Sequence, residues 1–180
     1  MNWSQKYRHL KDKNYNKKKD DDEISPDLLF TTYVEKLKEL YSQFNSIVEG
    51  TMIQSKYHKV LIAKEPRNSI FSEKEKIDAL ILSDNDNELK LIPDGIHFVG
   101  VLGRVTIKAY RKVYTFNSII EKKIKLFKEP YLLLIHDKDN ENAITWGITQ
   151  EEDSAFIGKE VKKLSEIIIE KLLDEVFLSD

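Results

Sequence analysis

The chain has 180 residues, of which 41% are hydrophobic and 33% are charged, and its formal net charge at pH 7 is -2. This length suits one domain with a single core. The near balance of charge excludes a strongly basic protein held to nucleic acid mainly by bulk charge, although it is compatible with a local basic face. Because the chain has no cysteine, disulfides and thiolate zinc sites are excluded.

The sequence gives no sign of a membrane or secretory segment. No apolar run approaches the roughly 20 residues that cross a bilayer, and the first residues, MNWSQKYRHLKDK, lack the apolar stretch of a secretory signal. We therefore expect a cytoplasmic protein that makes no membrane contact.

Residues 1–24 are predicted to form a flexible polar arm. This segment changes sign abruptly at KKKDDDE and is poor in apolar residues. It cannot bury enough apolar surface to offset the entropy lost on ordering. One ordered domain is expected to follow, over residues 25–180.

The domain is predicted to open with an amphipathic helix. Ser25 suits the N-cap, and Pro26 suits the first helical position, where a missing N–H costs nothing. Apolar side chains then recur at steps of three and four, at Phe30, Tyr33, Val34, Leu37, Leu40, Tyr41, Phe44 and Val48. The helix should end near Gly50, a plausible C-cap.

Extended segments are predicted next, at residues 57–65, 76–83, 89–95 and 96–110. The second is a continuous apolar run typical of a strand covered on both faces. Pro93 and Gly95 should stop the third, and the glycines of the fourth permit a bend or bulge.

The apolar period then changes, which predicts a helix at TFNSIIEKKIKLF, residues 115–127. Its apolar face would consist of Phe116, Ile119, Ile120, Ile124 and Phe127. Two strands joined by the polar turn DKDNEN are expected at residues 131–137 and 143–149. A last helix is predicted from the stripe formed by Ile157, Val161, Leu164, Ile168, Leu172 and Val176.

This order favours an α/β fold with a mixed central β-sheet flanked by helices. A right-handed crossover would carry the strand at Thr106 through the helix at Ile119 into a parallel strand at Leu133.

The expected order of elements resembles the core of the PD-(D/E)xK nuclease-like superfamily. The segment KIDALIL, followed by LIPDGIHFVGVLGRVTIKAYRKVYTFNSIIEKKI, is similar to small bacterial nuclease-like domains. In that layout an Asp opens a buried strand, and a later strand carrying Glu-x-Lys leads into a helix. The resemblance covers Leu28 to about His136 and implies a restriction-endonuclease-like fold.

The resemblance implies a degenerate metal site. Asp78 would be the first Mg²⁺ ligand and Lys108 the catalytic lysine, but Thr106 stands where the second carboxylate belongs. Two carboxylates normally hold the metal, which polarises the phosphate and generates hydroxide. Asp94, in IPDG, is the substitute metal ligand.

A basic stretch with interleaved aromatic residues accompanies that site. Arg104, Arg111 and Lys112 lie near Lys108, Tyr110 and Tyr114 in the sequence, and such a pattern can follow a phosphate backbone. The prediction is therefore a nuclease-like domain that binds DNA, RNA or a protein partner without cleaving.

Two alternatives stay open. One is an active Mg²⁺-dependent nuclease that uses Asp78 and Lys108, and the other is a protein-binding immunity or adaptor module with no nucleic-acid role. In either case, Ile169 and Phe177 would widen the apolar face of the C-terminal helix, which could serve a protein partner or a homodimer.

Overall fold

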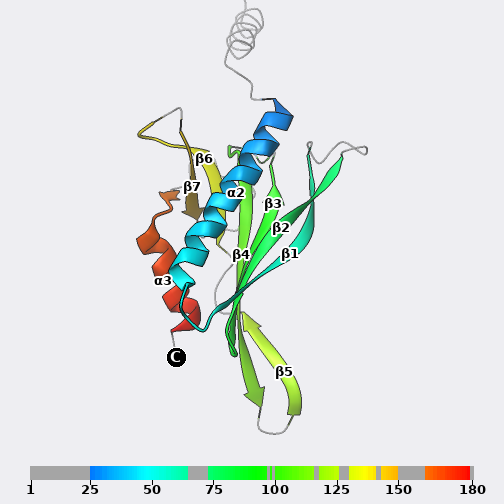
Figure 1. The fold of residues 1–180 in the computed structure, drawn as a ribbon, viewed down its shortest axis with the longest axis vertical. Helices are drawn as coiled ribbons and strands as arrows, with labels where there is room; N and C mark the ends of the chain where they lie inside the picture. Colours follow the sequence, from blue (N-terminus) through cyan, green and yellow to red (C-terminus); the bar gives the residue numbers. More distant parts are fainter. Residues whose placement is uncertain are drawn as a thin grey trace, which may run out of the picture.

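The computed structural model describes residues 25–64, 73–96, 98, 100–115, 118–125, 130–140, 143–149 and 161–178. The predicted arm at residues 1–24 and the stripe residue Ile157 lie outside the described residues. The described part consists of an antiparallel sheet and two helices (Figure 1).

The sheet has eight strands in the spatial order β1-β2-β3-β4-β6-β7-β8, with β5 paired to β4. Every strand pair in the described residues is antiparallel. The strands are β1 (Gln54–Ala63), β2 (Lys74–Ser83), β3 (Asn87–Gly95), β4 (Gly103–Thr115), β5 (Ser118–Lys125), β6 (Tyr131–His136), β7 (Ile144–Thr149) and β8 (Lys162–Lys163).

The first predicted helix is confirmed. The last is confirmed only from Glu166 onward, because Lys162–Lys163 form strand β8, so Val161 and Leu164 are not on the helix. Helix α2 runs over Pro26–Val48, and the Ser25 side chain accepts a hydrogen bond from the Leu28 backbone N–H. Helix α3 runs over Glu166–Phe177, with Ser165 as its N-cap. Neither described helix combines the length and apolar character that crossing a bilayer requires.

Helix α2 crosses one face of the sheet, with α3 beside it (Figure 1). Alternation places Leu80, Leu91 and Ile107 in one row of that face, because they are successive partners across β2, β3 and β4. All three are buried in the cluster that includes the apolar sides of both helices. Burial of these side chains is the main force holding the helices to the sheet.

Tyr33 of α2 fixes the helix to an irregularity between β3 and β4. The strand register shifts between Pro93 and Gly95, and Gly95 has a positive φ of 115°. The Tyr33 hydroxyl donates to the Arg104 backbone carbonyl over 2.6 Å and accepts from the Gly95 N–H over 3.3 Å. The side chain thus satisfies backbone groups that the shifted ladder leaves unpaired.

Two sequence predictions are wrong. Residues 118–125 form strand β5, antiparallel to β4, where a helix was expected. Strands β4 and β6 are antiparallel neighbours, so no parallel crossover joins Thr106 to Leu133. The sheet of the described residues is therefore antiparallel throughout, and the expected mixed sheet is corrected. The isoleucines of this segment suit a strand at least as well as a helix.

Candidate functional site

Lysines face one another on the side of the sheet away from the helices. Lys90 and Lys108 are cross-strand partners, and each follows a core residue by one position, so both side chains leave the opposite face. The Lys90 Nζ lies 3.2 Å from Glu88 Oε1 and 5.8 Å from the centre of the Tyr110 ring. Directly opposed like charges destabilise a sheet, and the Glu88 carboxylate on the same face offsets part of this repulsion.

The same pattern continues into the β4–β5 hairpin. Lys112 is the partner of Lys123, and Val113 is the partner of Lys122. In the four pairs from Tyr110↔Lys125 to Val113↔Lys122, five of the eight residues are cationic and none is acidic. We call these four pairs, together with Lys90 and Lys108, the basic ribbon.

The hairpin part of the basic ribbon projects from the body of the sheet. Beyond Lys112, whose N–H donates to the Asp86 carbonyl, β4 pairs only with β5 within the described residues. Figure 1 shows the two strands extending from the lower end of the sheet. A two-stranded ribbon of this kind fits the major groove of a nucleic-acid duplex.

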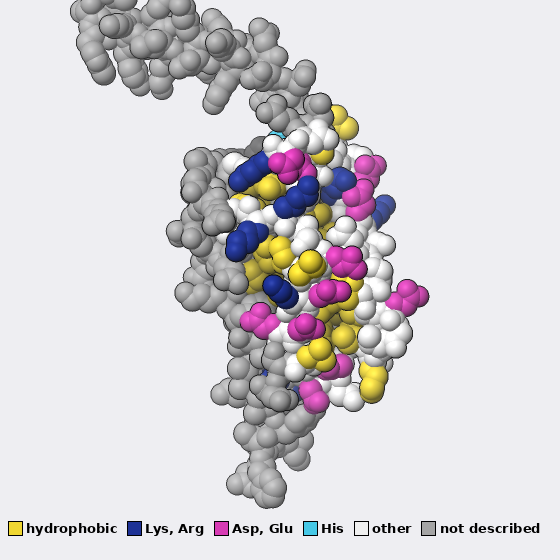
Figure 2. All heavy atoms as spheres, turned by 90° about the vertical axis from the view of Figure 1, so that its left-hand side faces the viewer, with side chains coloured by type: hydrophobic (Ala, Val, Ile, Leu, Met, Phe, Trp, Pro, Cys, Tyr) yellow, Lys and Arg dark blue, Asp and Glu magenta, His cyan; other side chains and the backbone are white. Residues whose placement is uncertain are grey.

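The helix-covered side carries charge of both signs. Figure 2, which looks at the α3 edge of the molecule, shows acidic and basic side chains interspersed around apolar ones. Exposed acidic residues of α3 are Glu166, Glu170, Asp174 and Glu175. The basic ribbon therefore differs in charge from this side, although the whole chain is nearly neutral.

Asp94 and Arg104 form a compact cluster at the other end of the β3–β4 pair. Arg104 Nε and Thr106 Oγ1 both donate to Asp94 Oδ2, over 2.9 Å and 2.6 Å. The Arg104 guanidinium carbon lies 4.1 Å from the centre of the Phe98 ring and 4.7 Å from that of Tyr131. Asp94 and Arg104 thus have structural partners, and Thr106 stands at the expected acid position as a donor to Asp94.

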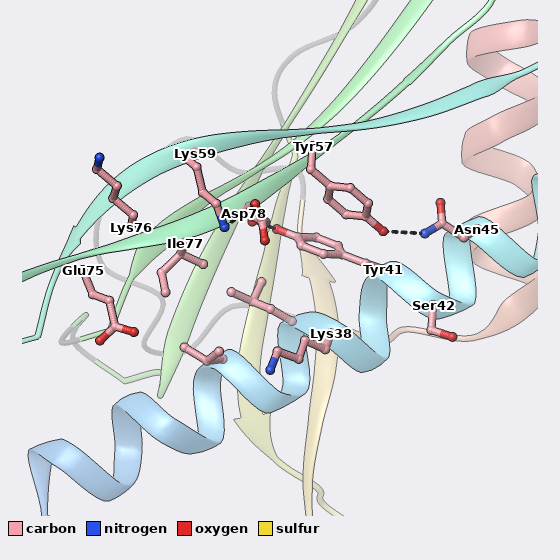
Figure 3. Close-up of a pocket in the computed structure, with 12 residues that line it drawn as sticks. Lys38, Tyr41, Ser42, Asn45, Tyr57, Lys59, Glu75, Lys76, Ile77 and Asp78 are labelled. Atoms are coloured by element: carbon pink, nitrogen blue, oxygen red, sulfur yellow. Dashed lines mark hydrogen bonds and ion pairs between the residues drawn. The ribbon is translucent and has the colours of Figure 1, made fainter.

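Asp78 lies in a different environment, in a groove between α2 and the β1–β2 hairpin (Figure 3). Its Oδ1 atom is 2.7 Å from Lys59 Nζ. Its backbone carbonyl accepts a hydrogen bond from the Tyr41 hydroxyl over 2.7 Å. Burial, aided by the Asp78 charge, raises the pKa of Tyr41, so this hydroxyl remains a donor.

The structure does not bring Asp78 and Lys108 together. Asp78 shares a strand face with Leu80 on the helix-covered side, and Lys108 leaves the sheet on the other side. Asp94 is on the Lys108 side and is paired with Arg104. Among the described residues, no group of three His, Cys, Asp or Glu side chains is placed to hold a metal ion.

Of the predicted nucleic-acid contacts, Arg111 and Lys112 belong to the basic ribbon and Arg104 does not. Arg111 Nε also donates to Asn87 Oδ1 over 3.2 Å. Sequence reasoning missed Lys90, Lys122, Lys123 and Lys125, because it placed the last three on a helix. The segment SIIEKKIK has no strict alternation, so its local pattern carried no clear signal for a strand beyond its three isoleucines. Comparisons with family models, curated proteins and solved structures found no match to this chain.

Proposed function

We propose that this chain binds nucleic acid through the basic ribbon, without cleaving it. One observation carries the proposal: the strand register pairs Lys90 with Lys108 and Lys112 with Lys123. The Lys112–Lys123 pair concentrates positive charge at a cost that a row of phosphates relieves, whereas Glu88 offsets part of the charge of the Lys90–Lys108 pair. Tyr110, between the two pairs in β4, adds an aromatic ring of the type that stacks on bases.

Cleavage is not part of this proposal, because the residues expected to hold Mg²⁺ point to different sides of the sheet. A hydrolytic site needs its metal ligands and its lysine around one phosphate. Here Lys59 pairs with Asp78 and Arg104 with Asp94. Kinship with the nuclease-like superfamily stays a proposal that enzymatic assays can test.

A salt titration of binding tests the proposed function. Fluorescence anisotropy would measure the affinity of the purified chain for labelled duplex DNA, single-stranded DNA and RNA over a range of salt. Phosphate contacts lower log K linearly with log salt, by about 0.9 per contact on duplex DNA. We expect affinity for at least one of these probes and a slope that corresponds to several contacts.

Charge reversal locates the interface. Replacing Lys112→Glu together with Lys123→Glu should weaken binding at least about tenfold and reduce the salt slope by about two contacts. The control pair Lys162→Glu with Lys171→Glu changes the net charge equally at exposed sites outside the ribbon. Absence of binding at low salt, or equal losses in both double variants, would refute the proposal.

A further inference from the structure

The first strand of the sheet is an open edge. Among the described residues, β1 pairs only with β2. Its ten residues carry no proline, and two large apolar side chains, Tyr57 and Leu61, are 55% and 62% exposed. A long edge strand with exposed apolar side chains is a template for pairing with another extended segment.

The backbone groups available at that edge follow from the ladder. The Lys64 N–H donates to the Glu73 carbonyl over 2.9 Å, and this bond lies in register with the continuous β1–β2 pairing. Hydrogen-bonded and non-hydrogen-bonded pairs alternate in an antiparallel ladder. Tyr57, Lys59 and Leu61 therefore direct their N–H and carbonyl groups outward, away from β2.

The groove beside Asp78 lies next to this edge. It has a volume of about 600 Å³ and is bounded by α2 on one side and by β1 and β2 on the other (Figure 3). Val34, Leu37 and Ile77 supply apolar surface, and Tyr41 and Tyr57 face each other with ring centres 6.2 Å apart. A hydrogen bond between Asn45 Nδ2 and the Tyr57 hydroxyl, 2.9 Å long, links its two sides.

The charges of the groove indicate the sign of its ligand. Asp78 pairs with Lys59, and Glu75 pairs with Lys64. Lys38 and Lys76 also line the groove, and neither has an ion-pair partner among the described residues. The cations left over favour an acidic ligand, and they disfavour a second copy of β1, which would bring Lys56 and Lys59 close to their own counterparts.

We propose that β1 and this groove bind an extended acidic peptide of a partner protein by strand addition. The peptide backbone pairs with the outward groups of Tyr57, Lys59 and Leu61. Alternate apolar side chains of the peptide lie toward the groove, and its carboxylates lie near Lys38 on α2, because the Lys76 ammonium is directed away from α2 (Figure 3). In this mode main-chain hydrogen bonds supply affinity and the side-chain pockets supply specificity.

Synthetic peptides test this inference on the full chain. The probe is a labelled peptide that alternates Glu with Val, Ile and Tyr, and its binding is measured by anisotropy. Two matched peptides are controls: one has Lys in place of Glu, and one has proline at alternate positions, which removes ladder donors. We expect the acidic probe to bind at least about tenfold more tightly than either control.

Two variants test whether the peptide binds at β1 and the groove beside it. Leu61→Pro removes an outward N–H that β2 does not use and should abolish binding. Lys38→Glu, on the exposed side of α2, should weaken it about fivefold, whereas Lys171→Glu on α3 should not change it. Thermal unfolding measures whether Leu61→Pro is folded. If that variant is unfolded, Lys38→Glu still tests the inference independently.

Hydrogen exchange supplies a second readout. The acidic peptide should slow exchange at the amides of Tyr57, Lys59 and Leu61. The inference is overturned if the acidic peptide fails to bind, if both control peptides bind as well, or if neither Leu61→Pro nor Lys38→Glu weakens binding. It is also overturned if sedimentation shows a dimer that Leu61→Pro dissociates, because a second copy then occupies the edge.

Discussion

The contact between Tyr33 and Gly103 shows how a single residue fixes α2 to the sheet. A Cβ atom built on Gly103 would lie 2.4 Å from Tyr33 Cδ2. Tyr33 is fully buried and holds two backbone groups through its hydroxyl. The ring therefore has little freedom to move aside, and the absence of a side chain at residue 103 is a packing requirement.

Gly103→Ala should lower the free energy of unfolding by about 2 kcal/mol, since overpacking forces the ring or the backbone to shift. Urea denaturation measures this loss. Gly50→Ala is the control: no atom lies within 4 Å of its added Cβ, and its cost comes only from its positive φ. Gly103→Ala unfolding at the wild-type urea midpoint would contradict the packing argument.

Tyr33→Phe keeps the ring and removes only the hydroxyl. The part-buried Arg104 carbonyl and the buried Gly95 N–H then lose a partner, which should cost about 1–3 kcal/mol. Tyr57→Phe is the matched control, because Tyr57 is exposed and its hydroxyl accepts an exposed hydrogen bond from half-buried Asn45. Similar urea midpoints for the two variants would show that the Tyr33 hydroxyl contributes no more to stability than the Tyr57 hydroxyl.

Tyr33 and Tyr41, both buried on α2, contribute to the response of stability to high pH. Burial raises the pKa of Tyr33 and of Tyr41 above the usual value, whereas tyrosines in the unfolded chain titrate near about 10. Above that pH the unfolded state loses protons that the folded state retains. Their contribution to stability is therefore complete below about pH 10 and falls as the pH rises further.

Urea midpoints between pH 8 and pH 11 measure this fall. Tyr41→Phe should make the decline shallower, because one proton is no longer retained on folding. Tyr57→Phe serves again as the exposed control. An unchanged slope in Tyr41→Phe would show that its hydroxyl does not stay protonated in the folded state.

At the scale of elements, α2 was readable from the sequence and β5 was not. Ser25, Pro26 and the apolar steps of three and four define one helix without needing any other part of the chain. The isoleucines at residues 119, 120 and 124 fit a helix face locally, and only pairing with β4 decides for a strand. Tertiary context overrides a weak local period in such segments.

The basic ribbon was unpredictable for the same reason. Arg111 and Lys112 were recognisable as cations on a strand, but Lys123 comes opposite Lys112 only through the register of β4 and β5. The register of β2, β3 and β4 likewise decides on which faces of the sheet the Asp78 and Lys108 side chains lie. The sequence predicts which side chains of one strand share a face. It does not predict which residues of two strands are partners, or which face of the sheet the helices cover.

A pair of cysteines tests the corrected element directly. The chain has no cysteine of its own, so Lys112→Cys with Lys123→Cys introduces a single pair at partner positions. Cross-strand partners have Cβ atoms about 4.5–5.5 Å apart, close to disulfide geometry, so mild oxidation should join them within one chain. Mass spectrometry of a digest detects the link. The control is Lys112→Cys with Lys125→Cys, two positions out of register, and equally efficient linkage there would argue against the strand.

At the scale of the molecule, the antiparallel sheet separates the two halves of the expected catalytic site. Helices α2 and α3 cover one side, where Asp78 lies in the groove, and Lys108 leaves the other side within the basic ribbon. A phosphate bound by Lys108 and Lys112 would therefore lie on the far side of the sheet from Asp78. The two binding functions that we propose would therefore use different sides of the sheet.

This separation predicts the result of a cleavage assay. Plasmid, single-stranded DNA and RNA, each incubated with the chain and Mn²⁺, should give no cleavage that Asp78→Ala abolishes, because a metal at Asp78 cannot reach a phosphate near Lys108. Lys108→Ala should weaken nucleic-acid binding and should not change the amount of uncut nucleic acid. Gel electrophoresis and anisotropy on the same samples distinguish the two effects. Metal-dependent cleavage that disappears in folded Asp78→Ala would restore the nuclease assignment and place its substrate in the groove beside α2.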